Sequence, residues 1–529
     1  MNRLVTLTHL LFISHSLAST PGSPTYEAGV VEFNYGSGRI VDPIATLESN
    51  LAKYLEIMMN APSNLDIIVF PEMTLNQLET ALEIPEIEEK VSPCENTSYV
   101  ATNVLKQISC SAKMLQRYVV VNMVTKAKCP DSDMIAEKDP RKCSDRSDGF
   151  SYYNTNVVFD RSGTLISRYR KFNLFGEKVD KPFQPSMVHF DTDFGVRFGH
   201  FICFDLQFRY PALELVRNFN ITDIVFTSMW YSELPFLTAV QLQQYWAFSN
   251  DVNLLAAGSN NPTIASTGTG IYAGRKGSLI SVMERTNSSK LFTATVPKKG
   301  SGDNITFNEF AIRYPKSEMA SLDLWRDQLE PYSMLFLEDD PMTLKVSNKV
   351  KQCHGDFCCI FDYTFERTTT QPHYRYALAV YHGKRTFSGL ADGGVIVCAV
   401  IACQSDDVAT CGVRNETLDF VHHWHNLQIC GAIPYGQQYN FMPNTLDASI
   451  MPFGVNELSY EQITVQDDTG AFWYNISIRL TNFSRQEFYT FGIYGRDFNL
   501  DATATSHNLQ YSWVLFGFIT LLSTHILLP

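Results

Sequence analysis

Basic residues are scarce in this sequence. Its 529 residues include 42 Lys and Arg against 55 Asp and Glu, which gives a formal net charge of -13 at pH 7. Binding to a phosphate backbone requires concentrated Lys and Arg, and no stretch of this chain supplies them. We therefore expect no nucleic-acid partner. The sequence also has no internal repeat and no low-complexity tract, and its 45% hydrophobic content argues against a mostly disordered chain.

A hydrophobic run with the features of a spanning helix is also missing. The apolar tail, Trp513 to Leu528, has 16 residues, and no Lys or Arg follows residue 496. A spanning helix usually needs about 20 apolar residues and a charged cytoplasmic flank. A polar spacer precedes the tail, and before it lie small residues at Asp501, Ala502 and Thr503. This order predicts a glycosylphosphatidylinositol (GPI) anchor signal over residues 501–529, removed on processing. A transmembrane helix and a buried C-terminal element are the alternatives.

The N-terminus has the pattern of a secretory signal peptide over residues 1–20. Arg3 precedes a mainly apolar run at residues 4–13, and small residues around Ala18 offer a cleavage site. A buried first helix is the alternative, but the prolines at positions 21 and 24 would break it. Secretion agrees with seven glycosylation sequons, which begin at Asn96, Asn220, Asn287, Asn304, Asn415, Asn475 and Asn482. We expect a protein on the outer face of the cell membrane.

The twelve cysteines fall into two groups with one residue between them. The first group comprises Cys94, Cys110, Cys129 and Cys143, and the second comprises Cys353, Cys358, Cys359, Cys398, Cys403, Cys411 and Cys430. In a secreted chain such groups predict disulfides rather than a metal site. Cys203 has no cysteine near it in the sequence, so we expect it to stay reduced. At least one of the other eleven is then unpaired or pairs between chains.

Two domains are predicted from the apolar patterns. Residues 26–310 alternate short apolar strands with helical patterns, which indicates an α/β domain. Strands are expected at residues 66–70, 118–123, 156–159, 164–171, 198–203, 224–228 and 254–258, with helices at 43–58, 211–219 and 238–250. The first helix has Asp42 as its N-cap, and Ile44, Leu47, Leu51, Leu55 and Met58 form its predicted buried face. After a connection at residues 311–345, strands dominate residues 346–500, which predicts a smaller, mainly β, disulfide-bearing domain.

Three predicted strand ends each carry a different chemical group, namely Glu72, Lys171 and Cys203. Strand ends are where α/β folds place catalytic groups. A thiol with an ordinary pKa of about 8.5 is mostly protonated at neutral pH, so a nucleophilic cysteine needs a base or a nearby cation. The Glu and the Lys could supply both, although an inert core thiol and two solvated charges are the simpler interpretation of each residue alone. A Cys-His pair is disfavoured because His200 is three positions away on a strand and points to the other face.

The sequence around these residues resembles the nitrilase superfamily of carbon-nitrogen hydrolases, and within it the vanin and biotinidase branch. The matching stretches occur in the family's order and are Ile67-Ile68-Val69-Phe70-Pro71-Glu72, Tyr169-Arg170-Lys171-Phe172-Asn173-Leu174-Phe175-Gly176-Glu177 and Gly199-His200-Phe201-Ile202-Cys203-Phe204-Asp205. The resemblance extends over nearly the whole chain, because that branch also has a signal peptide, a second disulfide-bearing domain and often a lipid anchor.

The resemblance implies an α-β-β-α sandwich in which the three residues converge. Cys203 would be the nucleophile that forms an acyl-thioester, and Glu72 the general base and acid. Lys171 would stabilise the oxyanion together with the backbone N-H of Phe204. Glu177 resembles a second family glutamate that orients the lysine or the substrate. The implied chemistry requires no metal or organic cofactor.

The implied activity is hydrolysis of a small-molecule linear amide. A vanin-type enzyme would cleave pantetheine to pantothenate and cysteamine, and a biotinidase-like enzyme would cleave biotinyl amides. A catalytically silent surface glycoprotein is the alternative from another functional class. It is disfavoured because all three catalytic positions carry the expected residue types. The membrane would be contacted only through the lipid anchor.

Overall fold

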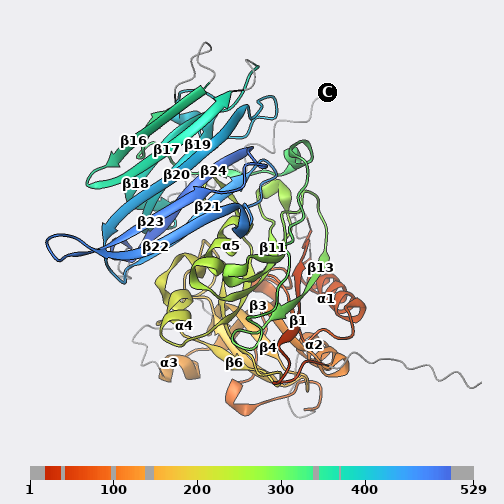
Figure 1. The fold of residues 1–529 in the computed structure, drawn as a ribbon. Coiled ribbons are helices and arrows are strands. Elements are labelled where there is room, and N and C mark those ends of the chain that lie inside the picture. The colour runs from red at the N-terminus through yellow and green to blue at the C-terminus, as the bar shows by residue number, and fades with distance from the viewer. Residues whose placement is uncertain are drawn as a thin grey trace, which may run out of the picture.

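The computed structural model describes residues 18–36, 42–96, 103–136, 148–337, 345–367 and 371–501. Most of the predicted signal peptide, Cys143, and the anchor residues Ala502 and Thr503 with the tail after them lie outside the described residues. The chain forms an α/β domain, at the bottom of Figure 1, and a mainly β domain above it.

The first domain is built on two six-stranded sheets that pack face to face. One sheet has the order β13-β1-β2-β3-β4-β5, with bounds β13 (Lys290–Pro297), β1 (Thr25–Glu32), β2 (Ile67–Val69), β3 (Tyr118–Lys128), β4 (Phe150–Phe159) and β5 (Leu165–Arg170). The other has the order β12-β11-β10-β8-β7-β6, with bounds β12 (Ser278–Val282), β11 (Thr269–Ala273), β10 (Asn253–Gly258), β8 (Asp223–Ser228), β7 (Arg197–Ile202) and β6 (His189–Asp191). Apolar side chains from both sheets form one core between them.

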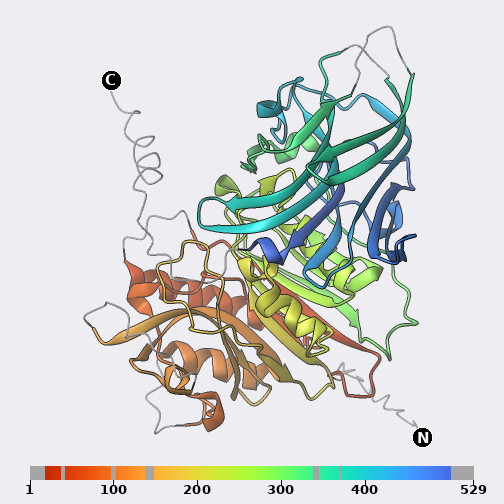
Figure 2. The same ribbon diagram turned by 90° about the vertical axis from the view of Figure 1, so that its left-hand side faces the viewer.

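Helices cover the outer faces of both sheets (Figure 2). α1 (Pro43–Asn60) and α2 (Asn103–Leu115) pack on the first sheet, and α4 (Glu214–Arg217) and α5 (Ala239–Asn250) lie on the side of the second. A short helix, α3 (Ser132–Ala136), follows β3. The layers therefore follow the order α-β-β-α, which confirms the predicted sandwich.

The first helix begins as its sequence predicts. The Asp42 carboxylate accepts hydrogen bonds from the backbone N-H groups of the first turn, and proline occupies the first helical position. Leu47, Leu51 and Met58 are buried, but Ile44 is 63% exposed, so its predicted burial is wrong. Ile44 lies in the first turn, which extends past the packed part of the helix.

The second domain is a sandwich of two five-stranded sheets. The first comprises β15 (Ser333–Phe336), β18 (Arg375–Phe387), β19 (Ala391–Cys403), β24 (Phe488–Asp497) and β21 (Tyr439–Asp447). The second comprises β16 (Lys345–His354), β17 (Phe357–Arg367), β20 (His422–Pro434), β23 (Phe472–Leu480) and β22 (Leu458–Gln466). Trp424 on β20 meets Tyr376 on β18 with ring centroids 5.3 Å apart, so the aromatic core lies between the sheets.

Disulfides form in both cysteine groups, as the secretory pattern predicts. The described pairs are Cys94–Cys110, Cys353–Cys358, Cys359–Cys398 and Cys403–Cys411, and Cys129 is also disulfide-bonded. The Cys359–Cys398 bond joins β17 to β19 and so ties the two sheets of the second domain together. Among the described residues Cys203 and Cys430 are free thiols. The expectation of a reduced Cys203 is therefore confirmed, and Cys430 is a further described cysteine without a disulfide partner within the chain, as the odd number of remaining cysteines requires.

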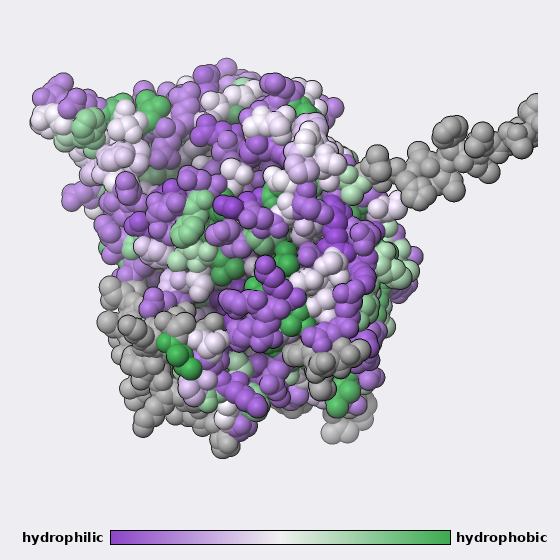
Figure 3. Space-filling model, turned by 90° about the horizontal axis from the view of Figure 1, so that it is seen from below, coloured by the Kyte–Doolittle hydropathy of each residue, from purple (hydrophilic) through white to green (hydrophobic). Residues whose placement is uncertain are grey.

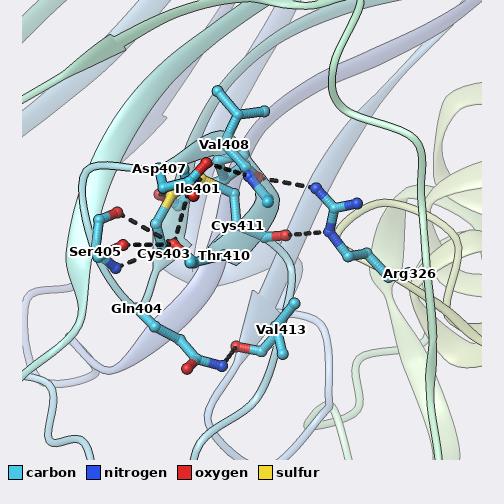
Figure 4. The surroundings of a disulfide bond; sticks show 11 residues. Arg326, Ile401, Cys403, Gln404, Ser405, Asp407, Val408, Thr410, Cys411 and Val413 are labelled. Carbon is cyan, nitrogen blue, oxygen red and sulfur yellow. Dashed lines mark hydrogen bonds between the residues drawn. A yellow bond between two sulfur atoms is a disulfide. The ribbon is translucent and has the colours of Figure 1, made fainter.

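The connection between the domains is attached to both of them. Its short strand β14 (Trp325–Arg326) pairs with β9 (Glu233–Leu234) of the first domain. The guanidinium of Arg326 donates to the backbone oxygens of Cys411 and Val408 at 2.9 and 2.8 Å, beside the Cys403–Cys411 disulfide (Figure 4). This attachment fixes Trp325 next to the first domain.

Helix α5 lies at the junction of the two domains (Figure 1). Every residue from 239 to 247 is buried, because one side of the helix packs on the first domain and the other faces β21. Its polar side chains bond across the junction. Gln241 donates to the Asn444 side chain at 2.8 Å, and Gln244 donates to the backbone oxygen of Phe453 at 2.7 Å.

A buried ion-pair network also crosses the junction. Arg385, on β18, donates to Glu233 at 2.6 Å and to Asp327 at 2.8 Å. The Arg385 and Asp327 side chains are 5% and 2% exposed. Burial raises the pKa of Asp327 to about 6, although the guanidinium opposes that rise. Each buried charge in this network therefore depends on its partner.

The end of the molecule formed by the first domain is mostly hydrophilic in its described part, and hydrophobic residues occur there in small groups (Figure 3). Such scattered groups are normal on protein surfaces. In the described part of the chain, no helix combines the length and the apolar character needed to cross a membrane.

We predict that Arg385→Met destabilises the protein by about 3 to 5 kcal/mol, because it leaves the buried carboxylate of Asp327 and the partly buried carboxylate of Glu233 without their cation. The loss should be larger at pH 8 than at pH 5. The pKa of Asp327 is already raised, so below it the carboxyl can be protonated and neutral, whereas above it the unpaired charge must be buried. Thermal melting at the two pH values measures the effect.

Arg197→Met is the matched control, since Arg197 pairs with Asp191 on the surface, where both side chains are more than half exposed. It should leave the melting temperature nearly unchanged at both pH values. A similar small change for Arg385→Met would contradict the network's role at the junction.

Candidate active site

The three predicted site residues follow strands and come together between the two sheets. Glu72 lies shortly after β2, Lys171 directly after β5 and Cys203 directly after β7. Strands β2 and β3 are parallel, and β4 is antiparallel to both β3 and β5, so β2 and β5 run in the same direction. All three residues are buried, with 2%, 1% and 5% exposure.

Lys171 pairs with two carboxylates. Its ammonium donates to Glu72 Oε1 at 2.8 Å and also contacts Glu177 Oε1. Burial disfavours the charged lysine, but the two glutamates outweigh burial and raise the pKa of Lys171 well above its usual value. Burial likewise disfavours the Glu177 anion, but the ammonium prevails and lowers the pKa of that carboxyl. The lysine therefore carries its charge inside the protein.

Glu72 is held by donors from three directions. Besides Lys171, the Asn154 side-chain amide donates to Glu72 Oε1 at 2.7 Å, and the backbone N-H of Met229 donates to Oε2 at 2.7 Å. Burial nevertheless raises the pKa of Glu72 above that of an ordinary glutamate, against the lowering effect of Lys171. The carboxylate is thus both fixed in position and more basic than a surface glutamate.

Cys203 occupies a sharp turn between β7 and the short 3₁₀ helix Cys203–Gln207. Its φ is 47°, in the left-handed region that few non-glycine residues adopt. The thiol donates to the backbone oxygen of Met229 at 3.6 Å. Burial and the neighbouring Glu72 charge raise the pKa of Cys203 well above the usual thiol value. The resting thiol is therefore protonated and needs a base to become a nucleophile.

The turn at Cys203 is attached to the segment after Lys171 through Asp205. The Asp205 carboxylate accepts from the Tyr169 hydroxyl at 2.7 Å, from the backbone N-H of Asn173 at 2.9 Å and from that of Ile202 at 3.1 Å. This buried carboxylate therefore holds the segments that carry Lys171 and Cys203 in a fixed position relative to each other. The N-H of Phe204 lies in the first turn of the 3₁₀ helix, where helical N-H groups have no helical acceptor.

Two contacts of Glu72 were not predicted from the sequence. Asn154 belongs to β4 and accepts from the buried amide of Asn122 on β3, which also donates to Asn156 on β4. Met229 acts through its backbone. Asparagines in an otherwise apolar strand are a signal that could have been noticed, since a buried amide needs partners. A backbone contact leaves no such signal, because any residue type can provide it.

A cavity opens at Cys203 along the junction of the domains. It is lined by the first domain, the connection and the second domain together. The lining residues are Phe175, Cys203, Phe204, Gln207, Met229, Trp230, Tyr231, Glu233, Leu237, Trp325, Phe387 and Ser388. Most of the wall is aromatic or aliphatic, so it suits an organic substrate with limited polarity.

The histidine closest to Cys203 in the sequence is engaged elsewhere. His200 bonds to Ser167 at 2.9 Å, and burial lowers the pKa of His200 to about 3, so it is neutral and engaged away from the thiol. In the part of the chain that the structure describes, no three His, Cys, Asp or Glu side chains gather to hold a metal ion.

The sequon asparagines differ in accessibility. Six are exposed, namely Asn96, Asn220, Asn287, Asn304, Asn475 and Asn482. Asn415 is half-buried, and its amide nitrogen donates to the Gln404 side chain at 3.3 Å. Glycosylation of the six exposed residues stays a prediction, and Asn415 is the poorest candidate among the seven.

The chain is similar to known proteins over most of its length. The carbon-nitrogen hydrolase family matches residues 34–300, and the vanin C-terminal domain matches residues 322–501. Vanin-like protein 1 of Drosophila melanogaster is 36% identical over 92% of this chain and 88% of its own length. Biotinidase of Takifugu rubripes is 32% identical over 72% of this chain and 80% of its own. Pantetheinase of Homo sapiens is 32% identical over 63% of this chain and 62% of its own.

We predict that Lys171→Met destabilises the protein by about 3 to 5 kcal/mol, because the buried carboxylate of Glu72 and the partly buried carboxylate of Glu177 then lie close together without a cation. Adding Glu177→Gln should recover part of this loss, since it removes one of the two charges at nearly constant volume. Denaturant unfolding of the single and double variants measures both effects. A double variant less stable than Lys171→Met alone would contradict this account.

Proposed function

Because the chain belongs to the carbon-nitrogen hydrolase family and carries the C-terminal domain of the vanins, we propose that it cleaves pantetheine to pantothenate and cysteamine. It is an amidohydrolase of the vanin type, which acts on non-peptide carbon-nitrogen bonds. One observation above all supports the site of this reaction: the Lys171 ammonium contacts Glu72 beside the free, buried thiol of Cys203.

In the first half of the reaction, Glu72 takes the thiol proton and the Cys203 thiolate attacks the amide carbonyl. Burial raises the pKa of both groups, so the carboxylate is a stronger base than usual and the thiolate a more reactive nucleophile. The Lys171 ammonium and the Phe204 N-H stabilise the oxyanion that forms. Glu72 then donates its proton to the departing amine, which leaves an acyl-thioester.

In the second half, Glu72 removes a proton from water, and the hydroxide attacks the thioester carbonyl. The same donors hold the second oxyanion. The tetrahedral intermediate collapses, the carboxylic acid leaves, and the proton returns from Glu72 to the Cys203 sulfur. Glu177 keeps the ammonium in place through both halves, because it contacts the same Lys171 nitrogen.

The names of the relatives point to two candidate substrates with different acyl groups, namely pantetheine and biotinyl amides. Pantetheinases and biotinidases are both about one third identical to this chain. Vanin-like proteins match 80% to 92% of this chain and the biotinidases 72% to 74%, which supports the vanin-type substrate pantetheine. Incubation with pantetheine and with biotinyl-lysine, followed by measurement of the released amine, decides between them. Faster release of lysine than of cysteamine would favour the biotinidase-like alternative.

We predict that acid quenching during turnover traps the acyl group on the peptide that contains Cys203. Cys203→Ala should lose the adduct and turnover. Glu72→Gln should lower kcat by about 10²-fold to 10⁴-fold, because it removes the proton acceptor and preserves the volume. Peptide mass analysis and amine release measure the two effects.

Cys430→Ala is the matched control, since Cys430 is the other free thiol among the described residues and belongs to β20 of the second domain. It should retain both the adduct on Cys203 and normal turnover. An adduct on Cys430 or undiminished hydrolysis by Cys203→Ala would overturn the mechanism.

The mature protein is further proposed to be a glycoprotein held at the outer cell surface by a GPI anchor. Asp501 is fixed to the second domain, because its carboxylate contacts the buried Arg496 guanidinium and accepts from the Gly394 N-H at 3.1 Å. Attachment needs an accessible backbone, so these contacts make Asp501 a poor attachment residue.

We predict that phosphatidylinositol-specific phospholipase C releases the protein from intact cells. A chain that ends at Gln510 should instead be secreted, because it lacks the apolar tail needed for anchoring. Immunoblots of cells and medium measure both outcomes. Retention on the cells after phospholipase treatment, together with a detectable C-terminal tag, would exclude the lipid anchor.

A further inference from the structure

Gln207 is a buried polar residue in the cavity wall, and the mechanism does not use it. It is 2% exposed and lines the same cavity as Cys203. Neither its amide nitrogen nor its amide oxygen has a hydrogen-bond partner among the described residues. An unpaired buried amide is destabilising, and an apolar side chain of similar size would avoid that cost. Its position therefore calls for a partner inside the cavity.

The backbone of Gln207 is fixed from both sides. The residue ends the 3₁₀ helix that begins at Cys203, so it is tied to the turn that carries the thiol. Its backbone oxygen accepts from the buried guanidinium of Arg496, which also donates to the Gly394 oxygen at 2.9 Å. The second domain thus holds Gln207 at a set position relative to the sulfur. A fixed donor and acceptor lose little entropy when they bind a ligand.

Among the described residues that line the cavity, only Gln207 has a side-chain amide. Phe204 and Phe387 pack with ring centroids 5.4 Å apart, and Tyr231 and Trp325 stack at 5.0 Å. Glu233 is engaged by Arg385. In such a cavity a small number of polar groups sets the orientation of the ligand.

The charges around the cavity favour a neutral ligand. Lys171 and Arg385 each form ion pairs with two carboxylates of the described chain. Their positive charges are therefore already balanced, and neither favours a substrate whose acyl chain is negatively charged. A neutral primary amide offers one acceptor and two donor hydrogens. Its complement is a group that has both an N-H and a C=O, such as a secondary amide or a ureido group.

We propose that Gln207 is a specificity-determining residue that hydrogen-bonds an amide or ureido group in the neutral acyl chain of the substrate. This assignment rests on the proposed amidohydrolase function and adds a residue that selects the acyl chain. It also explains why the second domain contributes to the site. Arg496 holds the backbone of Gln207 in position, and Phe387 lines the same cavity.

The test uses two 4-nitroanilides with acyl chains of equal length, which report hydrolysis by colour. One chain contains a secondary amide, and in the other two methylene groups replace it. The wild-type protein should prefer the amide-containing chain by about 10-fold to 100-fold in kcat/KM, as one buried hydrogen-bonded group allows. In Gln207→Leu this ratio should fall to within about 3-fold, through a lower kcat/KM for the amide-containing chain. Gln207→Met is the second variant, in case a branched side chain does not fit.

Gln244→Leu is the matched control. Gln244 is also a buried glutamine, but its side-chain amide donates to the backbone oxygen of Phe453. In the Gln244→Leu variant this oxygen still accepts a hydrogen bond from the Tyr245 hydroxyl. This variant should keep the wild-type preference, so a loss confined to position 207 separates recognition from general destabilisation. Melting curves confirm that the variants are folded.

Two results would overturn the assignment in distinguishable ways. Equal hydrolysis of both anilides by the wild-type protein, or an unchanged preference in Gln207→Leu and Gln207→Met, would mean that the amide is satisfied without the substrate. The amidohydrolase function would then stand and the role of Gln207 would fall. No hydrolysis of either anilide, or of pantetheine and biotinyl-lysine, would contradict the proposed function and this assignment with it.

Discussion

The buried contact of one ammonium with two carboxylates is the constraint on which the site depends. Lys171 is stable inside the protein only because Glu72 and Glu177 surround it, and each glutamate in turn needs the cation. The three residues come from separate segments, so the contact exists only once the first sheet has brought the ends of β2 and β5 together, with β3 and β4 between these strands. Cys203 enters the same environment from the opposite sheet, where burial raises the pKa of its thiol.

The second domain is part of the site as well as a cover for the first. Its strand β18 supplies Arg385, which holds Glu233 in the cavity wall, and Phe387, which lines the wall directly. Its strand β24 supplies Arg496, which holds the backbone at Gln207. Helix α5 explains why the two domains stay together, since its buried faces pack on both sides. The vanin C-terminal domain thus shapes the cavity in which the first domain performs chemistry.

Local sequence patterns predicted that helices and strands are present more accurately than they predicted where these elements begin and end. The α1 cap and the buried strands before Glu72 and Cys203 were found where expected, because their signals involve near neighbours in sequence. β3 and β4 are longer than predicted, and six strands of the first domain, β1, β6, β9, β11, β12 and β13, were not predicted. Their apolar runs are short, and pairing with distant strands decides whether such runs become β structure. Ile44 was placed in the core by periodicity alone, which cannot tell where a helix leaves the core.

The sequence by itself determined the domain types, the reduced state expected for Cys203 and the identity of the three residues at strand ends, because residue chemistry and short-range spacing carry that information. Only the tertiary structure decided which groups meet. The contacts of Asn154 and the Met229 backbone with Glu72, the link from Arg496 to Gln207 and the cavity shared by two domains join residues that are tens to hundreds of positions apart. Such contacts follow from how sheets stack and domains pack, and local sequence spacing does not encode them.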